Sequence, residues 1–256
     1  MPAHAGLAAV SRSVFDPLVD AYDAGRPSYP DQLYDAIERL AQPLRGTDVV
    51  EVGAGTGIAT RALEARGARV VALDLGAAML RRLRERSGCT PVAVADAHAL
   101  PLGDGVADLV CYAQAWHWVR VPKAVAEVRR VLRPAGTLAA WWNDVSAADA
   151  PWWQAQQDRL EAWSPGYSRD YRRRDWSAEL AGVPGIESVA VASCDWVRPL
   201  SMEQYETWLR SKSYVAALAD RLPEFLAAER ASVAAAFPDG VVQEPFRTVL
   251  VVARVP

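Results

Sequence analysis

The sequence predicts an α/β fold in which a mostly parallel sheet is flanked by helices. Between about residues 48 and 142, short apolar runs alternate with amphipathic helical patterns, the order that parallel strands and their crossover helices produce. The first run leads into the glycine-rich segment "VGAGTG", as expected for a strand that ends in a tight ligand-binding loop. With 256 residues, 51% of them hydrophobic, the chain can bury the core of one such domain.

Apolar runs and helical periodicity locate the elements of this fold. The predicted strands are "DVVEV", "RVVALD", "PVAVAD", "ADLVCYA" and "TLAAWW", followed at the end of the chain by "FRTVLVVARVP". The predicted helices are "DQLYDAIERLAQ", "IATRALEARG", "AAMLRRLRERSG" and "VPKAVAEVRRVLRPAG". Gly67 is expected to cap the second of these helices, while Pro134 and Gly136 are expected to stop the fourth.

The remaining segments are expected to cover the edge of the sheet that holds the ligand. We expect one domain over 1–256 that consists of an N-terminal lid (15–42), a cofactor-binding core (46–143), two substrate-cap insertions (145–185 and 201–240) and a C-terminal strand region (241–256). Ser201 and Gln204 form a predicted capping box for a cap helix. Eight of the ten tryptophans lie between positions 116 and 176, which predicts an aromatic pocket, a dense core or a mixture of both.

Charge and cysteine content exclude several classes of function. The formal charge of -3 and the pI of about 5.7 provide no basic field, so nucleic acid is not expected as a partner. Cys89, Cys111 and Cys194 are odd in number and widely spaced, which fits neither a disulfide framework nor a metal site. No segment has the roughly 18 uninterrupted apolar residues of a membrane span. We therefore expect a cytoplasmic protein without metal or membrane contact, either a monomer or a homodimer.

The spacing of the glycine loop decides between nucleotide-like ligands. A dinucleotide site would need G-x-G-x-x-G, but Ile58 stands where the third glycine should be, and the observed pattern is G-x-G-x-G. A phosphate-binding P-loop would need a lysine, and none occurs between positions 46 and 122. The acidic Glu51 before the loop disfavours a pyrophosphate and favours an amino group or another cation.

Several motifs in the same order resemble those of a known superfamily. "VVEVGAGTG", then "VVALD", then "VAVADAHALPLGDGVADLVCYAQAWHWV" are similar to the ordered motifs of class I S-adenosylmethionine-dependent methyltransferases, and within them to the type 11 group that acts on small molecules. The resemblance covers about residues 20–143. It implies a Rossmann-like, seven-stranded sheet whose last strand is antiparallel, and S-adenosylmethionine as the cofactor.

Cofactor contacts are expected at the strand ends. Asp74 ends the second strand 19 residues after Gly55, where a carboxylate can accept both ribose hydroxyls, unless it caps the next helix. Asp96 can accept from the adenine amino group while the amide of Ala97 faces a ring nitrogen; a solvated aspartate is the alternative. Glu51 resembles the acid that orients the loop and the methionine amino group, or it only stabilises the loop. The expected cofactor-binding residues are Tyr22, Arg26, Glu51, Gly53, Ala54, Gly55, Gly57, Asp74, Leu75, Asp96, Ala97 and Gln114.

The segment "QAWHWV" after the fourth strand is expected to reach the reacting centre. Ligands of open α/β sheets bind beyond the carboxyl ends of the strands, so Trp116, His117 and Trp118, together with Trp142, are the expected acceptor-binding residues. His117 is the candidate catalytic base, with a packed histidine between two aromatic residues as the alternative. Aromatic faces would suit a flat or cationic acceptor and exclude water.

The predicted function is S-adenosylmethionine-dependent methyl transfer to a small organic acceptor. Because the cation's charge vanishes during in-line displacement, alignment and exclusion of water can supply most of the rate. The alternatives are a protein that binds the cofactor without transferring methyl, and a NAD-dependent oxidoreductase, which Ile58 disfavours. An RNA or protein methyltransferase is disfavoured because "QAWH" stands in place of an Asn/Asp-Pro-Pro-Tyr/Phe type tetrapeptide.

Overall fold

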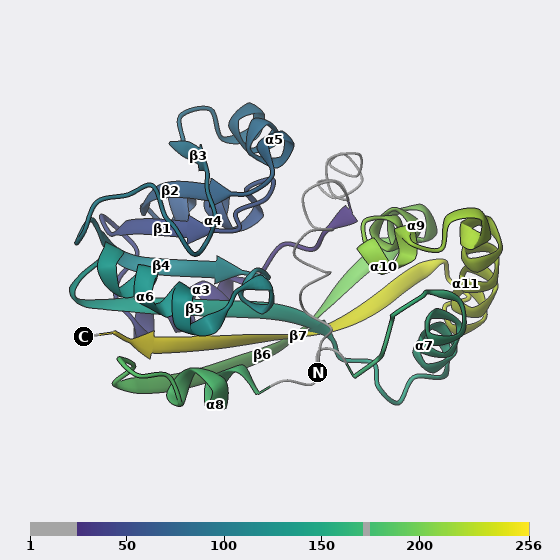
Figure 1. The fold of residues 1–256 in the computed structure, drawn as a ribbon. Helices are drawn as coiled ribbons and strands as arrows, with labels where there is room; N and C mark the ends of the chain where they lie inside the picture. Colours follow the sequence, from purple (N-terminus) through teal and green to yellow (C-terminus); the bar gives the residue numbers. More distant parts are fainter. Residues whose placement is uncertain (1–24, 171–174, 256) are drawn as a thin grey trace.

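A seven-stranded, mostly parallel sheet forms the centre of the molecule, as predicted. The computed structural model describes residues 25–170 and 175–255 (Figure 1). The strands lie in the order β3-β2-β1-β4-β5-β7-β6, and β7 runs antiparallel to both of its neighbours. Their bounds are β1 (Asp48–Val52), β2 (Arg69–Asp74), β3 (Val92–Val94), β4 (Ala107–Ala113), β5 (Leu132–Val145), β6 (Ser188–Ser201) and β7 (Val241–Arg254).

Helices cover both faces of the sheet. One face packs against α3 (Asp31–Leu40), α4 (Ile58–Ala65) and α5 (Ala77–Ser87), whose apolar stripes bury residues such as Ile37 and Leu63. The other face packs against α6 (Val121–Val131) and α8 (Trp176–Ala181) through residues such as Val128 and Leu180. Strands β1 and β4 are therefore buried on both faces, which explains their nearly continuous apolar sequences.

The helix that precedes β5 ends earlier than the sequence predicts. Pro134 and Gly136 were expected to stop it, but α6 ends at Val131 and both residues lie within β5. A proline disfavours helical geometry at the residue before it and lacks an N–H group, so Arg133 and Pro134 already belong to extended backbone. Gly67, in contrast, has a φ of +88° directly after α4 and donates its N–H to the carbonyl of Glu64, as expected for a C-terminal cap.

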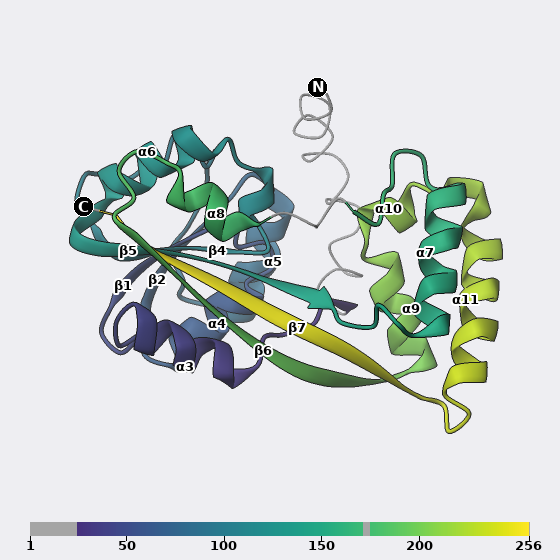
Figure 2. The same cartoon turned by 90° about the horizontal axis from the view of Figure 1, so that it is seen from below.

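Beyond the carboxyl ends of the parallel strands lies a second group of helices, here called the helical unit (Figures 1 and 2). It contains α7 (Pro151–Trp163), α9 (Met202–Arg210), α10 (Ser213–Ala216), the short 3-10 helix η3 (Ala219–Arg221) and α11 (Leu222–Ala236). The unit has its own apolar core, and long β6 and β7 connect it to the sheet (Figure 2). The capping box is confirmed, since Ser201 accepts from the Gln204 N–H and Gln204 accepts from the Ser201 N–H.

A buried ion pair joins two helices of the helical unit. Glu229 of α11 is fully buried and accepts from Arg159 of α7 at 2.8 Å and from Gln156 at 2.8 Å. A buried charge is tolerated only where such partners replace water, so this cluster fixes the relative placement of the two helices. Within residues 25–170 and 175–255, no helix is both long and apolar enough to span a membrane.

Candidate cofactor-binding site

The glycine loop between β1 and α4 has the backbone that its sequence predicts. Gly53, Gly55 and Gly57 all have positive φ angles, +76°, +55° and +82°, which residues with a side chain rarely adopt. The N–H groups of Gly53 and Ala54 both donate to the carbonyl of Leu73, at 2.7 Å and 3.0 Å. The loop is therefore fixed to the end of β2, the strand that carries Asp74.

Gly53 is a position where even one added methyl group is expected to disrupt the loop. A Cβ there would lie 2.4 Å from the Cβ of Ala115, in addition to the strain of the positive φ. We expect Gly53→Ala to lower the free energy of unfolding by about 2 to 4 kcal/mol, as measured by urea unfolding. Gly240→Ala is the matched control, since Gly240 has the same φ of +76° but no atom within 4 Å of the added Cβ. Equal losses in the two variants would show that backbone strain alone accounts for the effect.

Asp74 connects the glycine loop to the start of α5. Its Oδ2 accepts from the N–H of Gly55 at 2.8 Å, and its Oδ1 accepts from the N–H of Gly76 at 2.7 Å. Gly76, rather than Asp74, occupies the N-cap position of α5. Both carboxylate oxygens are thereby oriented by backbone N–H groups at the carboxyl end of β2. Leu75 follows with 37% exposure, at the same edge of the sheet.

Asp96 lies past the end of β3 and is paired with a histidine that the sequence analysis did not single out. Its Oδ1 accepts from the backbone N–H of His98 at 2.9 Å and lies 2.6 Å from the Nδ1 atom of the same residue. The backbone N–H of His98 contributes most to holding the pKa of Asp96 below its ordinary value. Ala97 stands between the two residues and is half-buried against the core of the sheet.

Glu51 is completely buried beneath the glycine loop. Its Oε2 accepts from the hydroxyl of Thr60 at 2.5 Å, while its Oε1 has no hydrogen-bond partner among the described residues. Burial raises the pKa of Glu51 to about 8, and the nearby charge of Asp74 acts in the same direction. A carboxyl group in this environment favours a cationic neighbour, because a positive charge would restore the ionised form.

The end of β4 carries a strained residue. Gln114 has a φ of +56°, which is uncommon for a residue with a side chain and occurs most often at functional sites. Its N–H donates to the carbonyl of Trp141 at 2.9 Å, and its Nε2 donates to the carbonyl of Asn143 at 3.1 Å. These bonds hold the Gln114 side chain across the carboxyl ends of β4 and β5.

The four candidate acceptor residues have different environments. Trp116 is fully buried, with its ring edge against Tyr112, and Trp142 is buried and stacked on Trp176 at 5.2 Å. His117 and Trp118 follow in the 3-10 helix η2 (Trp116–Trp118), where His117 is half-buried and Trp118 is 41% exposed. The structure thus places the half-buried His117 and the exposed Trp118 just past the end of β4, and Trp116 and Trp142 within packed aromatic pairs.

The segment before α3 lies against the helical unit. Arg26 donates from Nη2 to the carbonyl of Ser211 at 2.9 Å, and Arg198 donates to the carbonyl of Gly25 at 2.9 Å. A Cβ at Gly25 would lie 2.8 Å from the Thr207 carbonyl oxygen of α9, so the two segments are in close contact. Tyr22, the other residue expected from this segment, lies outside the described residues.

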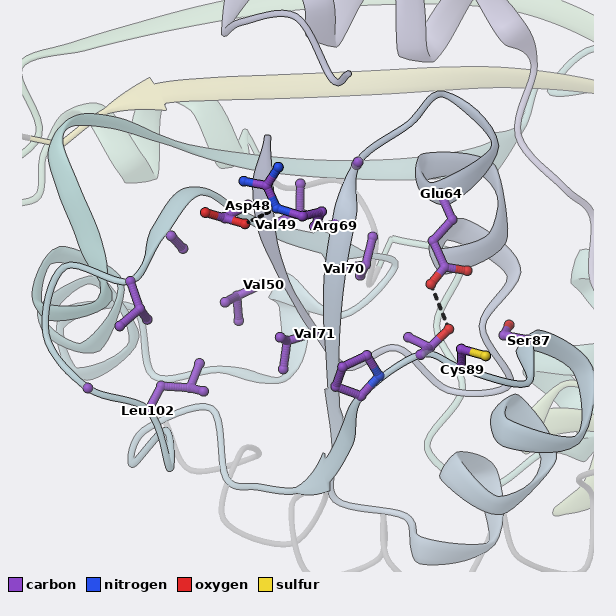
Figure 3. A pocket seen from close by; sticks show the side chains of 16 residues that line it. Asp48, Val49, Val50, Glu64, Arg69, Val70, Val71, Ser87, Cys89 and Leu102 are labelled. Carbon is purple, nitrogen blue, oxygen red and sulfur yellow. Dashed lines mark hydrogen bonds and ion pairs between the residues drawn. The ribbon is translucent and has the colours of Figure 1, made fainter. Parts of the chain in front are cut away.

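A cavity of about 580 Å³ lies at the opposite edge of the sheet (Figure 3). One side of the cavity is formed by the amino ends of β1 and β2, including Asp48 and Arg69. The other side is formed by Glu64 and Thr90, whose side chains are hydrogen-bonded at 2.6 Å. Strand β3 pairs only with the second half of β2, which leaves the first half accessible from this cavity. Because the glycine loop and Asp74 follow the carboxyl ends of the strands, this cavity is separate from the candidate site.

Comparisons with known proteins identify the family. Residues 50–140 match the family model described as a methyltransferase domain. An uncharacterized methyltransferase of Mycobacterium tuberculosis is 43% identical over 129 residues, which are 50% of this chain and 51% of the relative. An uncharacterized methyltransferase-like protein of Schizosaccharomyces pombe is 30% identical over 221 residues, 85% of this chain and 84% of the relative. The solved structure of a protein from Anaeromyxobacter dehalogenans, provisionally described as a type II methyltransferase, superposes with a TM-score of 0.65 at 25% identity and covers 90% of this chain and 97% of that one.

The chain belongs to the class I S-adenosylmethionine-dependent methyltransferases. The family model, the relatives and the strand order agree on this assignment. The chain matches about half the length of the first curated relatives. The family model covers residues 50–140, which include the glycine loop, Asp74 and Asp96.

Proposed function

We propose that this protein transfers a methyl group from S-adenosylmethionine to a small organic acceptor. The main support for the proposal is the position of Asp74. Its carboxylate accepts hydrogen bonds from the backbone N–H groups of Gly55, in the glycine loop, and of Gly76, at the start of α5. These two bonds orient a carboxylate at the carboxyl ends of the strands, where nucleotide-like ligands bind, and we propose that it accepts the ribose hydroxyls of the cofactor.

The residues around Asp74 fit the cofactor. Glu51 has a buried oxygen without a hydrogen-bond partner in the described part of the chain, beneath a loop in which Gly53, Gly55 and Gly57 have no side chains. A carboxyl group in this place suits a cofactor that carries an amino group and a sulfonium. Asp96 and the amide of Ala97 are proposed to bind the adenine, with Leu75 against its ring. Ala54, Gln114 and Arg26 complete the proposed contacts, with Tyr22 as a further proposed contact outside the described residues.

Positioning and exclusion of water are proposed to supply most of the catalysis. Bound S-adenosylmethionine supplies an electrophilic methyl group. The protein's part is to hold an acceptor in line with that methyl group, which can account for about 7 to 11 kcal/mol of the barrier in favourable cases. His117, at the end of β4, is proposed to take up a proton where the acceptor must lose one. Trp118, which is 41% exposed, is proposed to form an aromatic wall of the acceptor site, while the buried Trp116 and Trp142 are proposed to support it from the core.

The position of the helical unit favours the proposal that the acceptor is a small molecule. It stands beyond the carboxyl ends of the strands (Figures 1 and 2) and contacts the segment at Gly25 and Arg26. We propose that these two parts of the chain cover the acceptor. A screen of small organic acids, amines and phenols with radiolabelled S-adenosylmethionine tests this proposal. Methylation of RNA, DNA or protein alone would overturn it, and tight cofactor binding without any turnover would instead favour a binding protein.

Loss of the Asp74 carboxylate is expected to weaken cofactor binding. Asp74→Ala removes charge-assisted hydrogen bonds and should cost about 1 to 3 kcal/mol of binding free energy, as measured by calorimetry with S-adenosylhomocysteine. Asp195→Ala serves as the control, because Asp195 forms an exposed ion pair with Arg247 on the outer strands. Unchanged affinity in a folded Asp74→Ala protein would remove this residue from the site.

A further inference from the structure

His98 forms a bridge between the two chain segments that flank the proposed adenine position. Its Nδ1 lies 2.6 Å from Oδ1 of Asp96, and its Nε2 accepts from the backbone N–H of Arg120 at 2.9 Å. Arg120 is the N-cap residue of α6 and immediately follows the segment that contains His117 and Trp118. One imidazole ring therefore connects the end of β3 with the start of α6.

These contacts define which ring nitrogen carries the proton. Nε2 can accept from the Arg120 N–H only with its lone pair, so in the neutral ring the proton resides on Nδ1. That proton is donated to Oδ1 of Asp96, which also accepts the backbone N–H of His98. The side chain of Asp96 is 53% exposed, whereas that of His98 is only 15% exposed. The mostly buried ring thus holds a half-exposed carboxylate in one orientation.

We propose that His98 is a positioning residue for the cofactor, which orients the Asp96 carboxylate so that Oδ2 accepts from the adenine amino group. The inference rests on the proposed function. Without the ring, Asp96 would sample several rotamers, and binding would have to order it. The contact with Arg120 additionally fixes the ring itself, so that a single conformation is prepared before the cofactor arrives.

Two variants and two ligands separate this role from general support of the loop. His98→Phe keeps an aromatic ring but removes both nitrogens, while His98→Asn retains an N–H donor close to the Nδ1 position. The ligands are S-adenosylhomocysteine and its analogue in which hydrogen replaces the adenine amino group. We expect His98→Phe to weaken S-adenosylhomocysteine about tenfold, the size of one lost charged hydrogen bond, and to weaken the analogue less than about twofold. His98→Asn should bind S-adenosylhomocysteine nearly as tightly as the unmutated protein does.

Nitrogen NMR of the histidine rings in the unmutated protein tests the geometry without any substitution. A neutral ring with its proton on Nδ1 is expected for His98, and a proton on Nε2 would overturn the proposal even if His98→Phe failed to fold. The proposal would also be overturned if His98→Phe weakened the binding of both ligands equally, or of neither. The proposed function would stand in both cases. If the unmutated protein did not bind S-adenosylhomocysteine at all, the proposed function would fail, and this inference with it.

Discussion

Raising the pH from about 5 to 9 is expected to destabilise the ligand-free protein through Glu51 alone by about 4 kcal/mol. Burial raises the pKa of this carboxyl group from 4.5 to about 8 in the folded state. At pH values between 4.5 and about 8, Glu51 keeps its proton in the folded protein and releases it in the unfolded chain. The stabilising contribution is therefore complete below about pH 4.5 and is lost as the pH rises through 8, at roughly 1.4 kcal/mol per pH unit.

The variant Glu51→Gln isolates this contribution, because glutamine keeps the shape of the side chain but has no charge to bury. Burial also raises the pKa of Glu229 and Glu244, so the measured quantity is the difference between the two proteins in urea unfolding at a series of pH values. Glu51→Gln should gain stability relative to the unmutated protein as the pH rises, and by more than Glu224→Gln, which removes a carboxylate from an exposed helix position. Parallel pH profiles for Glu51→Gln and the unmutated protein would show that Glu51 ionises normally.

Local patterns were sufficient to predict most of the sheet and its covering helices. The runs that became β1, β2 and β4 are short and apolar because both of their faces are buried, and the helices between them have one clear apolar stripe. Strand β6 was not located from the sequence. Most of its residues are half-buried or exposed, so no apolar run marks it, and it is fixed by pairing with β7, whose residues lie about 50 positions away.

The candidate site was predictable where it depends on strand ends. Asp74 meets Gly55 because parallel strands bring their carboxyl ends together, and the 19-residue spacing reflects that topology. The contact of Gly53 with Ala115, the strained φ of Gln114 and the bridge formed by His98 depend on exact tertiary placement. Similarly, sequence alone could not separate Trp116, which is fully buried, from Trp118, which is 41% exposed two residues later.

Removal of the His117 imidazole is expected to slow methyl transfer strongly if the acceptor loses a proton during the reaction. His117 stands in η2 directly after β4, half-buried and with its ring 4.8 Å from that of Trp118. A positioned general base typically contributes about 100 to 10,000-fold in rate, or roughly 3 to 5 kcal/mol of the barrier. His117→Ala should therefore lower the single-turnover rate at least about 100-fold.

The measurement compares single-turnover rates across pH with an acceptor identified in the small-molecule screen. Cofactor affinity in His117→Ala should remain within about twofold of the unmutated protein, because the proposed cofactor contacts lie at Asp74, Glu51 and Asp96. Any inflection of the rate near neutral pH should also disappear, since histidine is the side chain that ordinarily titrates there. Asp195→Ala is the control, as it removes an exposed ion pair on the outer strands, away from the proposed acceptor site. A loss below about tenfold in His117→Ala, only ~1.4 kcal/mol of barrier, would assign catalysis to alignment of the two reactants and leave His117 as a wall of the acceptor site.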